Sequence, residues 1–282
     1  MASTEQSTST PPTSMASYEE PPPTIQFTNI KTLYQAIEEV SGDFLVVQNV
    51  SPRHFEEISS QEPRRFRLRR YHADKEILII TIPNALHEAL HIELYQSYVY
   101  QLWRKGIESW RSIGSTTLRP RGHPGGDGGE GDSSGGPRPA RAYKDSWPTL
   151  VIEAGDSESL GALRDDMRWW FSASDHQVNI VVLAKFDRSD QRIIIDRWEE
   201  EAQIRPGATT TRRPASNAVK PVLRQSITIT RDAATDSCHV ARSALVLSFR
   251  LLFLRDPGPL EGDFIISIAD LQAYARNVWL VV

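Results

Sequence analysis

The feature of this sequence best suited to chemistry is a short apolar run that ends in one carboxylate. Residues 149–154 read TLVIEA between Pro148 and Gly155, which is the pattern of a strand covered on both faces. Glu153 is then expected inside a sheet, near the carboxyl end of its strand. An unpaired buried carboxylate costs several kcal/mol, so Glu153 needs a metal ion, a proton or a nearby arginine. A salt bridge to an arginine is the simplest structural explanation.

A second candidate is the segment His87-Glu88-Ala89-Leu90-His91, which has the H-E-x-x-H spacing of zinc-dependent hydrolases. Two histidines four residues apart on a helix can bind one Zn²⁺, while the glutamate activates water. Glu108 is the nearest later carboxylate for a third ligand. Glu93 interrupts the apolar continuation that such helices usually have. The alternative is that both histidines are surface or boundary residues.

Five arginines gather between residues 64 and 70, in a chain whose formal net charge is −4. Arg65, Arg67 and Arg69 are expected on one face of a strand, with Phe66 and Leu68 on the other. Such a row can contact a nucleic-acid backbone. Acidic neighbours favour the alternative of a solvated strand face.

The elements that must position these residues mix strands and helices. We expect Asn84 to cap the helix that carries the HEALH segment, and Ser157 or Ser159 to cap the helix after Glu153. The pattern predicts an α/β fold with a mixed central sheet flanked by helices. Strands are expected at 44–50, 64–70, 76–82, 108–118, 149–154, 178–186, 192–198, 225–231 and 244–249, and helices at 30–40, 53–59, 84–105, 160–171 and 268–278.

Composition divides the chain into segments. Residues 1–24 are rich in Ser, Thr and Pro and predict a disordered tail. Residues 120–140 are rich in Gly and Pro and predict a loop or insertion, with 201–222 as a linker. The rest, residues 25–282, is expected to form a single domain with its core at 77–200.

Several protein classes do not fit this sequence. The single cysteine, Cys238, excludes an internal disulfide and a cysteine-rich zinc site, and it fits a reducing compartment. The expectation is a protein of the cytoplasm or nucleus without a membrane partner, because we find neither a secretory signal nor an apolar run long enough to span a bilayer. The sequence leaves the oligomeric state open.

A series of short motifs resembles a set of uncharacterised fungal proteins. Residues 147–160 resemble that set's PTLVIEVG-x-SES strand, and 164–170 its Leu-x-x-Asp-Ala-x-x-Trp helix. Residues 78–88 resemble its LII-x-x-P-x-x-x-HE entry to a helix. The order of the motifs over residues 78–279 carries the resemblance, and further matches lie at 114–117 (GSTT), 132–134 (DSS), 178–183, 193–198, 251–255, 261–263 and 270–271.

That fungal set in turn resembles the PD-(D/E)XK nucleases, which have the restriction-endonuclease-like fold. The resemblance implies a core of one helix, three strands, a helix and a strand. It places Glu88 on the first core helix, Asp132 on the second core strand and Glu153 on the third. Asp132 and Glu153 would ligate Mg²⁺ beside a scissile phosphate with Glu88 assisting, because a hard cation held by carboxylates polarises phosphate and generates hydroxide.

The sequence departs from this family at Gly155, where the motif has a lysine. Arg164 on the following helix is the best-placed replacement, and Arg168 is the second. An arginine can only stabilise charge there, because it stays protonated. Within the acidic, glycine-rich segment around Asp132, the alternatives are a solvated insertion or a different acidic residue, Asp127 or Glu130.

The leading expectation is therefore a nuclease-like protein that hydrolyses phosphodiester bonds with Mg²⁺ if it is active, and that has a nucleic acid as its partner. Two alternatives stay open. One is a non-catalytic binding or scaffold protein on the same fold. The other is a zinc hydrolase that uses His87, Glu88 and His91.

Overall fold

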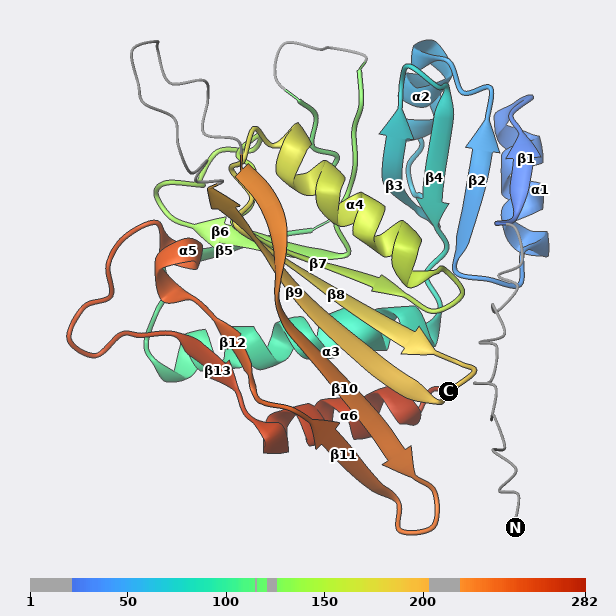
Figure 1. The fold of residues 1–282 in the computed structure, drawn as a ribbon. Helices are drawn as coiled ribbons and strands as arrows, with labels where there is room; N and C mark the ends of the chain where they lie inside the picture. The colour runs from blue at the N-terminus through green and yellow to red at the C-terminus, as the bar shows by residue number, and fades with distance from the viewer. Residues whose placement is uncertain (1–21, 115, 121–125, 203–218) are drawn as a thin grey trace, which may run out of the picture.

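The computed structural model describes residues 22–114, 116–120, 126–202 and 219–282 (Figure 1). The expected tail at 1–24 and the expected linker at 201–222 lie largely outside these residues. Within them, the expectation of an α/β fold with a mixed central sheet flanked by helices is confirmed. None of the helices in the described parts of the chain is long and apolar enough to cross a lipid bilayer.

The described strands form three sheets. The large sheet is mixed and has the strand order β11-β10-β9-β8-β7-β6-β5. It consists of β5 (Trp110–Ile113), β6 (Ser133–Pro137), β7 (Leu150–Gly155), β8 (Ile180–Asp187), β9 (Arg192–Ala202), β10 (Val219–Asp232) and β11 (Ser237–Ala241). A smaller sheet has the order β1-β2-β4-β3, and a third pairs β12 with β13. These consist of β1 (Thr24–Gln26), β2 (Phe44–Gln48), β3 (Arg67–His72), β4 (Ile77–Thr81), β12 (Leu245–Leu247) and β13 (Phe264–Ile266).

Helices cover both faces of the large sheet (Figure 1). On one face, α3 (Ala85–Arg104) and α6 (Ile268–Trp279) pack against side chains that include Ile152 of β7. On the other face, α4 (Leu160–Ala173) packs against Val151. Helices α1 (Ile30–Glu39) and α2 (Pro52–Ser59) pack on the small sheet, and α5 (Phe249–Phe253) follows β12.

Strand β7 lies in the interior of the large sheet, as its apolar sequence predicts. It pairs in parallel with β8 and antiparallel with β6, and all six of its residues are buried. Helix α4 connects the two parallel strands, and Ser159 caps its N-terminus by accepting from Ala162 N–H at 3.1 Å. Trp169 and Trp170 of this helix are core residues.

The prediction of a loop over residues 120–140 is wrong for residues 133–137, which form the buried strand β6. Glycine is required there by close packing. A Cβ atom on Gly135 would lie 2.6 Å from Trp110 Nε1 and 2.7 Å from the Tyr95 hydroxyl. The strand expected at 244–249 ends at Leu247, because Phe249 begins α5.

Candidate functional site

The first two acidic residues of the candidate site lie at neighbouring positions beside the start of β6. The β6–β7 register pairs Ser133 with Ile152, which places Asp132 opposite Glu153. Asp132 Oδ2 accepts a hydrogen bond from the Ala154 N–H at 2.9 Å. Both carboxylates are buried. The structure therefore brings these two residues to neighbouring positions on adjacent chain segments.

Arg67 of β3 connects Asp132 with Glu88, which lies in the first turn of α3. Its Nη2 atom donates to both carboxylate oxygens of Glu88 at 3.0 Å. Its Nη1 atom donates to Asp132 Oδ1 at 3.3 Å and to the Asp132 carbonyl at 3.2 Å. The guanidinium thus places one positive charge between Asp132, which the nuclease resemblance implies as a Mg²⁺ ligand, and Glu88, which it implies as an assisting residue.

Glu153 has different partners from these two carboxylates. Its side chain is fully buried against α4, and its Oε1 atom accepts a hydrogen bond from the Trp170 indole N–H. Burial raises the pKa of Glu153 well above its ordinary value, and the charge of Asp132 raises it further. Both effects favour the neutral carboxyl. The sequence leaves a metal ion, a proton or an arginine as ways to stabilise this buried carboxylate, and the structure favours the proton.

The arginine row on β3 is mostly buried rather than solvated. The expectation of a solvated strand face is wrong for Arg69 and Arg70, which are each 1% exposed. A register shift between Arg67 and Arg70 interrupts the alternation of β3, and both consecutive arginines are buried. Arg65 is exposed. A direct contact between a nucleic-acid backbone and Arg69 or Arg70 would require this region to open.

Buried carboxylates bind these two arginines. Asp166 of α4 lies 2.6 Å from Arg69 Nε and 3.0 Å from Arg70 Nη2. Glu158 lies 2.5 Å from Arg69 Nη1. The Arg70 guanidinium also stacks 3.7 Å from the centre of the Trp169 ring. The two arginines thus tie the small sheet to α4.

The acidic segment before β6 belongs to the same network. Glu130 is buried and accepts hydrogen bonds from Arg64 Nη2 at 2.9 Å and from Leu68 N–H at 3.0 Å. Asp127 accepts from the Ala73 N–H at 2.9 Å. The alternative of a solvated insertion is therefore wrong for these two carboxylates, which connect the segment before β6 with residues in and beside β3.

His87 lies between two carboxylates. Its Nδ1 atom is 3.1 Å from Asp43 Oδ2, and its Nε2 atom is 3.1 Å from Asp132 Oδ1. Burial lowers the pKa of His87, but Asp132 and Asp43 outweigh burial and raise that pKa to about 10. Asp43 also accepts from the N–H groups of Asp156 and Ser157, at the turn after β7. Near neutral pH, His87 is therefore expected to carry a proton on each nitrogen.

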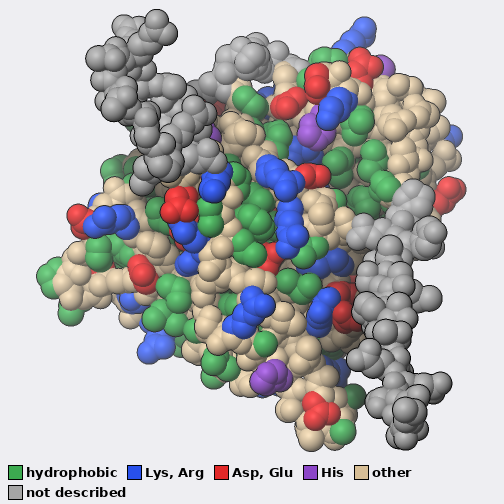
Figure 2. All heavy atoms as spheres, viewed as in Figure 1, with side chains coloured by type: hydrophobic (Ala, Val, Ile, Leu, Met, Phe, Trp, Pro, Cys, Tyr) green, Lys and Arg blue, Asp and Glu red, His purple; other side chains and the backbone are tan. Residues whose placement is uncertain are grey.

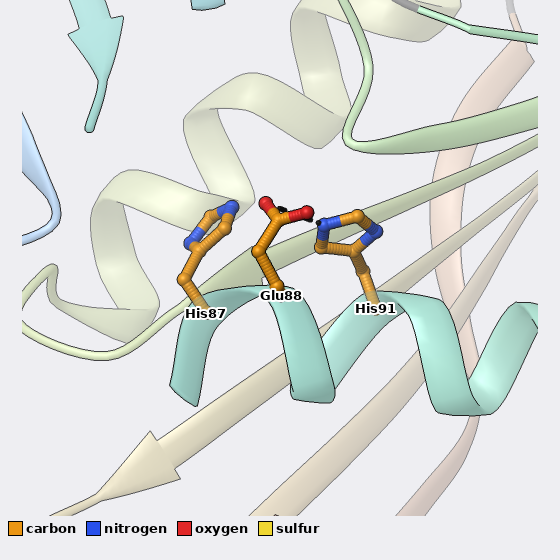
Figure 3. A group of neighbouring side chains, drawn as sticks. All are labelled: His87, Glu88 and His91. Atoms are coloured by element: carbon orange, nitrogen blue, oxygen red, sulfur yellow. Dashed lines mark hydrogen bonds and ion pairs between the residues drawn. The ribbon is translucent and has the colours of Figure 1, made fainter. Parts of the chain in front are cut away.

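His87, Glu88 and His91 lie side by side on the first turns of α3 (Figure 3). Their ligand atoms all lie within 4.8 Å of one another, which is the one such group of three that the described residues contain. His91 contacts Ser133 Oγ through Nδ1 at 2.8 Å and Arg67 Nη1 through Nε2 at 3.2 Å. Glu108 is exposed and lies beyond the far end of the helix.

This group does not fit Zn²⁺ as it is arranged. A zinc ligand must be a neutral imidazole, and the carboxylates of Asp43 and Asp132 on either side of His87 favour its protonated form. The guanidinium of Arg67 also faces His91 and Glu88. Mg²⁺ does not fit either, because Arg67 lies between Glu88 and Asp132, and Glu153 is turned to Trp170.

Arg164 contacts neither of the two buried carboxylates on β6 and β7 in the described hydrogen bonds and ion pairs. It lies 3.1 Å from Asp196 Oδ2 on β9, and Arg168 pairs with Asp165 on the exposed side of α4. At the position of the motif lysine, a Cβ atom on Gly155 would lie 3.1 Å from Leu163. Lys185 is the cross-strand neighbour of Gly155 and donates to the Asp156 carbonyl at 2.8 Å.

Sequence reasoning did not anticipate the roles of Arg67, Arg69, Arg70 and Asp43. The arginine row is an unusual signal in an acidic chain, yet nothing local indicates which carboxylates it meets, since Arg69 and Asp166 are 97 residues apart. No protein-family model matches the chain, and no curated protein matches it.

Proposed function

We propose that this chain is a non-catalytic binding or scaffold protein built on a fold that resembles the PD-(D/E)XK nucleases. One observation carries the proposal. The guanidinium of Arg67 contacts both Glu88 and Asp132, and the resemblance expects Asp132 to hold a divalent cation with the assistance of Glu88. The charge that a metal would supply comes from the chain itself.

The surroundings of Arg67 support a permanent role for it. If Arg67 moved away, the partly exposed Glu88 and the buried Asp132 would each lose a charged partner, and such a loss is costly for a buried carboxylate. Glu153 accepts a hydrogen bond from Trp170, and its burial favours the neutral carboxyl. A neutral carboxyl is a poor ligand for Mg²⁺. The contacts of Arg67 with Glu88 and Asp132 also join the four-stranded sheet to α3 and to the large sheet.

A Mg²⁺-dependent nuclease is the second candidate, and the register of the sheet favours it. Asp132 lies opposite Glu153, as the resemblance implies for the two metal ligands. Arg67 also lines a surface depression of about 310 Å³ together with Arg64 and Arg65, so a nucleic-acid phosphate could reach it. Activity on this route requires Arg67 to leave the carboxylates first.

A nucleic-acid partner would have to bind at a local site. On the face of the described residues shown in Figure 2, basic side chains lie singly or in small groups among acidic and apolar ones. A formal net charge of −4 fits this distribution. The single cysteine fits a protein of the cytoplasm or nucleus, which is the compartment that we propose.

A cleavage assay distinguishes the two candidates. Single- and double-stranded nucleic acids would be incubated with Mg²⁺ and the wild type, Glu153→Gln or Asp132→Asn. We expect no cleavage above background from any of the three proteins. Mg²⁺-dependent cleavage by the wild type that both substitutions abolish would overturn the proposal in favour of the nuclease.

A further inference from the structure

Helix α3 has an uncovered face that carries two large aromatic side chains. Tyr100 is 57% exposed and Trp103 is 75% exposed, and their rings stack with centres 6.0 Å apart. The Arg104 guanidinium lies 6.0 Å from the Tyr100 ring. Tyrosine, tryptophan and arginine are the residue types that carry most binding energy in protein interfaces.

Tyr100 and Arg104 line a preformed groove with a volume of about 750 Å³. One wall is β13, which lies beside α3 (Figure 1). Gln101 fixes that wall, because its side-chain amide donates to the Ile265 carbonyl at 2.7 Å and accepts from the Ile265 N–H at 3.1 Å. The side chain of Ile265, which lines the groove, is about half exposed. The groove thus combines apolar, aromatic and polar surface.

The charges along this helix face are arranged with opposite signs at its two ends. Glu93 lies at one end and is fixed by a hydrogen bond from Asn277 at 2.8 Å. Arg104 and Lys105 lie at the other end. Residues 93, 97, 100 and 104 follow spacings of four, three and four, which places them in one row along a helix.

An antiparallel copy of the same helix complements this row. If a two-fold axis passes between Ser97 and Tyr100, each Glu93 faces the Arg104 of the second copy. Each small Ser97 then faces the large Tyr100 of the second copy. A two-fold interface needs this kind of self-complementary surface.

We propose that two copies of this chain associate through α3 in this antiparallel arrangement. Glu93 and Arg104 form the two symmetric ion pairs, and Tyr100 and Trp103 supply the apolar contact. The inference is independent of whether the carboxylate site binds a metal, because α3 presents its other face to that site.

Charge reversal tests the arrangement through sedimentation-velocity measurements on the full chain. The wild type should sediment as a concentration-dependent dimer. Glu93→Lys and Arg104→Glu should each weaken dimerisation at least tenfold, because each variant faces like charges at both ends of its homodimer; tenfold corresponds to about 1.4 kcal/mol. An equimolar mixture of the two variants should recover the dimer, because opposite charges meet again at both ends.

Two further variants complete the test. Trp103→Ala should also weaken the dimer, whereas Arg53→Glu, a charge reversal on the exposed part of α2, should leave it unchanged. A monomeric wild type at all concentrations would overturn the proposal. So would a dimer that Glu93→Lys and Arg104→Glu leave intact, or a mixture of these variants that stays monomeric.

Discussion

At the scale of single residues, the fold controls the protonation of His87 through two direct contacts. It contacts a carboxylate on each nitrogen, and its pKa is raised from 6.5 to about 10. The folded protein therefore keeps a proton that the unfolded chain releases above pH 6.5. The stabilisation is complete below that pH and is lost as the pH rises through 10.

We therefore expect the free energy of unfolding to fall between pH 6.5 and 10, by at most about 1.4 kcal/mol per pH unit from this group. Urea unfolding at several pH values measures this slope, and His87→Gln, which cannot titrate, should flatten it. A wild-type slope that matches the slope of His87→Gln would show that His87 does not hold the proton.

Glu153 gives a second residue-scale prediction. Because its neutral carboxyl accepts the Trp170 indole N–H, Glu153→Gln keeps both shape and acceptor. We expect this change to alter stability by less than about 1 kcal/mol, whereas Glu153→Ala should cost about 2–4 kcal/mol through its cavity and the orphaned indole. A loss of more than about 3 kcal/mol in Glu153→Gln would instead indicate an ionised, paired glutamate.

The sequence predicted the burial of Glu153 and its need for compensation, because strand periodicity and the high energy of a buried charge are local arguments. It did not identify the partner. Trp170 lies one strand-to-helix connection away, and the indole N–H reaches the carboxyl only through the packing angle of α4. The sequence did not identify Asp43 as the partner of His87 either, because the two residues are 44 positions apart.

At the scale of elements, β3 and α4 are joined by ion pairs that can be broken selectively. Asp166→Ala leaves two buried guanidinium groups, Arg69 and Arg70, without their shared carboxylate. We expect a loss of about 3–5 kcal/mol in the free energy of unfolding. The matched control is Asp165→Ala on the same helix, because Asp165 is exposed and pairs with the exposed Arg168.

The control should change stability by no more than about 0.5 kcal/mol, as surface substitutions usually do. Denaturant unfolding of both variants provides the comparison. Equal midpoints for Asp166→Ala and Asp165→Ala would show that the β3–α4 network contributes nothing to stability.

Elements with strong periodicity followed the sequence closely, and elements made by packing did not. Helix α3 begins after its expected cap, where Asn84 accepts from the His87 N–H at 2.8 Å. Strand β6 was missed because two of its five residues are glycines, which carry no strand signal. Their role depends on Trp110 and Tyr95, which come close only in the folded protein.

At the scale of the whole molecule, the sequence predicted one mixed sheet flanked by helices but not the docking of a second sheet upon it. The contacts that hold the small sheet to the main body join residues far apart, such as Arg67 with Asp132 and Asp43 with Ser157. Local patterns carry no information on such pairings. The docking is what brings Arg67 to the carboxylates, so it decides the proposed function.

Calorimetric titration of the wild type with Mg²⁺ tests the central claim most directly. If Arg67 takes the place of the cation at Asp132, the titration should show no saturable heat, and Asp132→Asn should give the same flat trace. A saturable site with a stoichiometry of one ion or more per chain, lost in Asp132→Asn, would contradict the account.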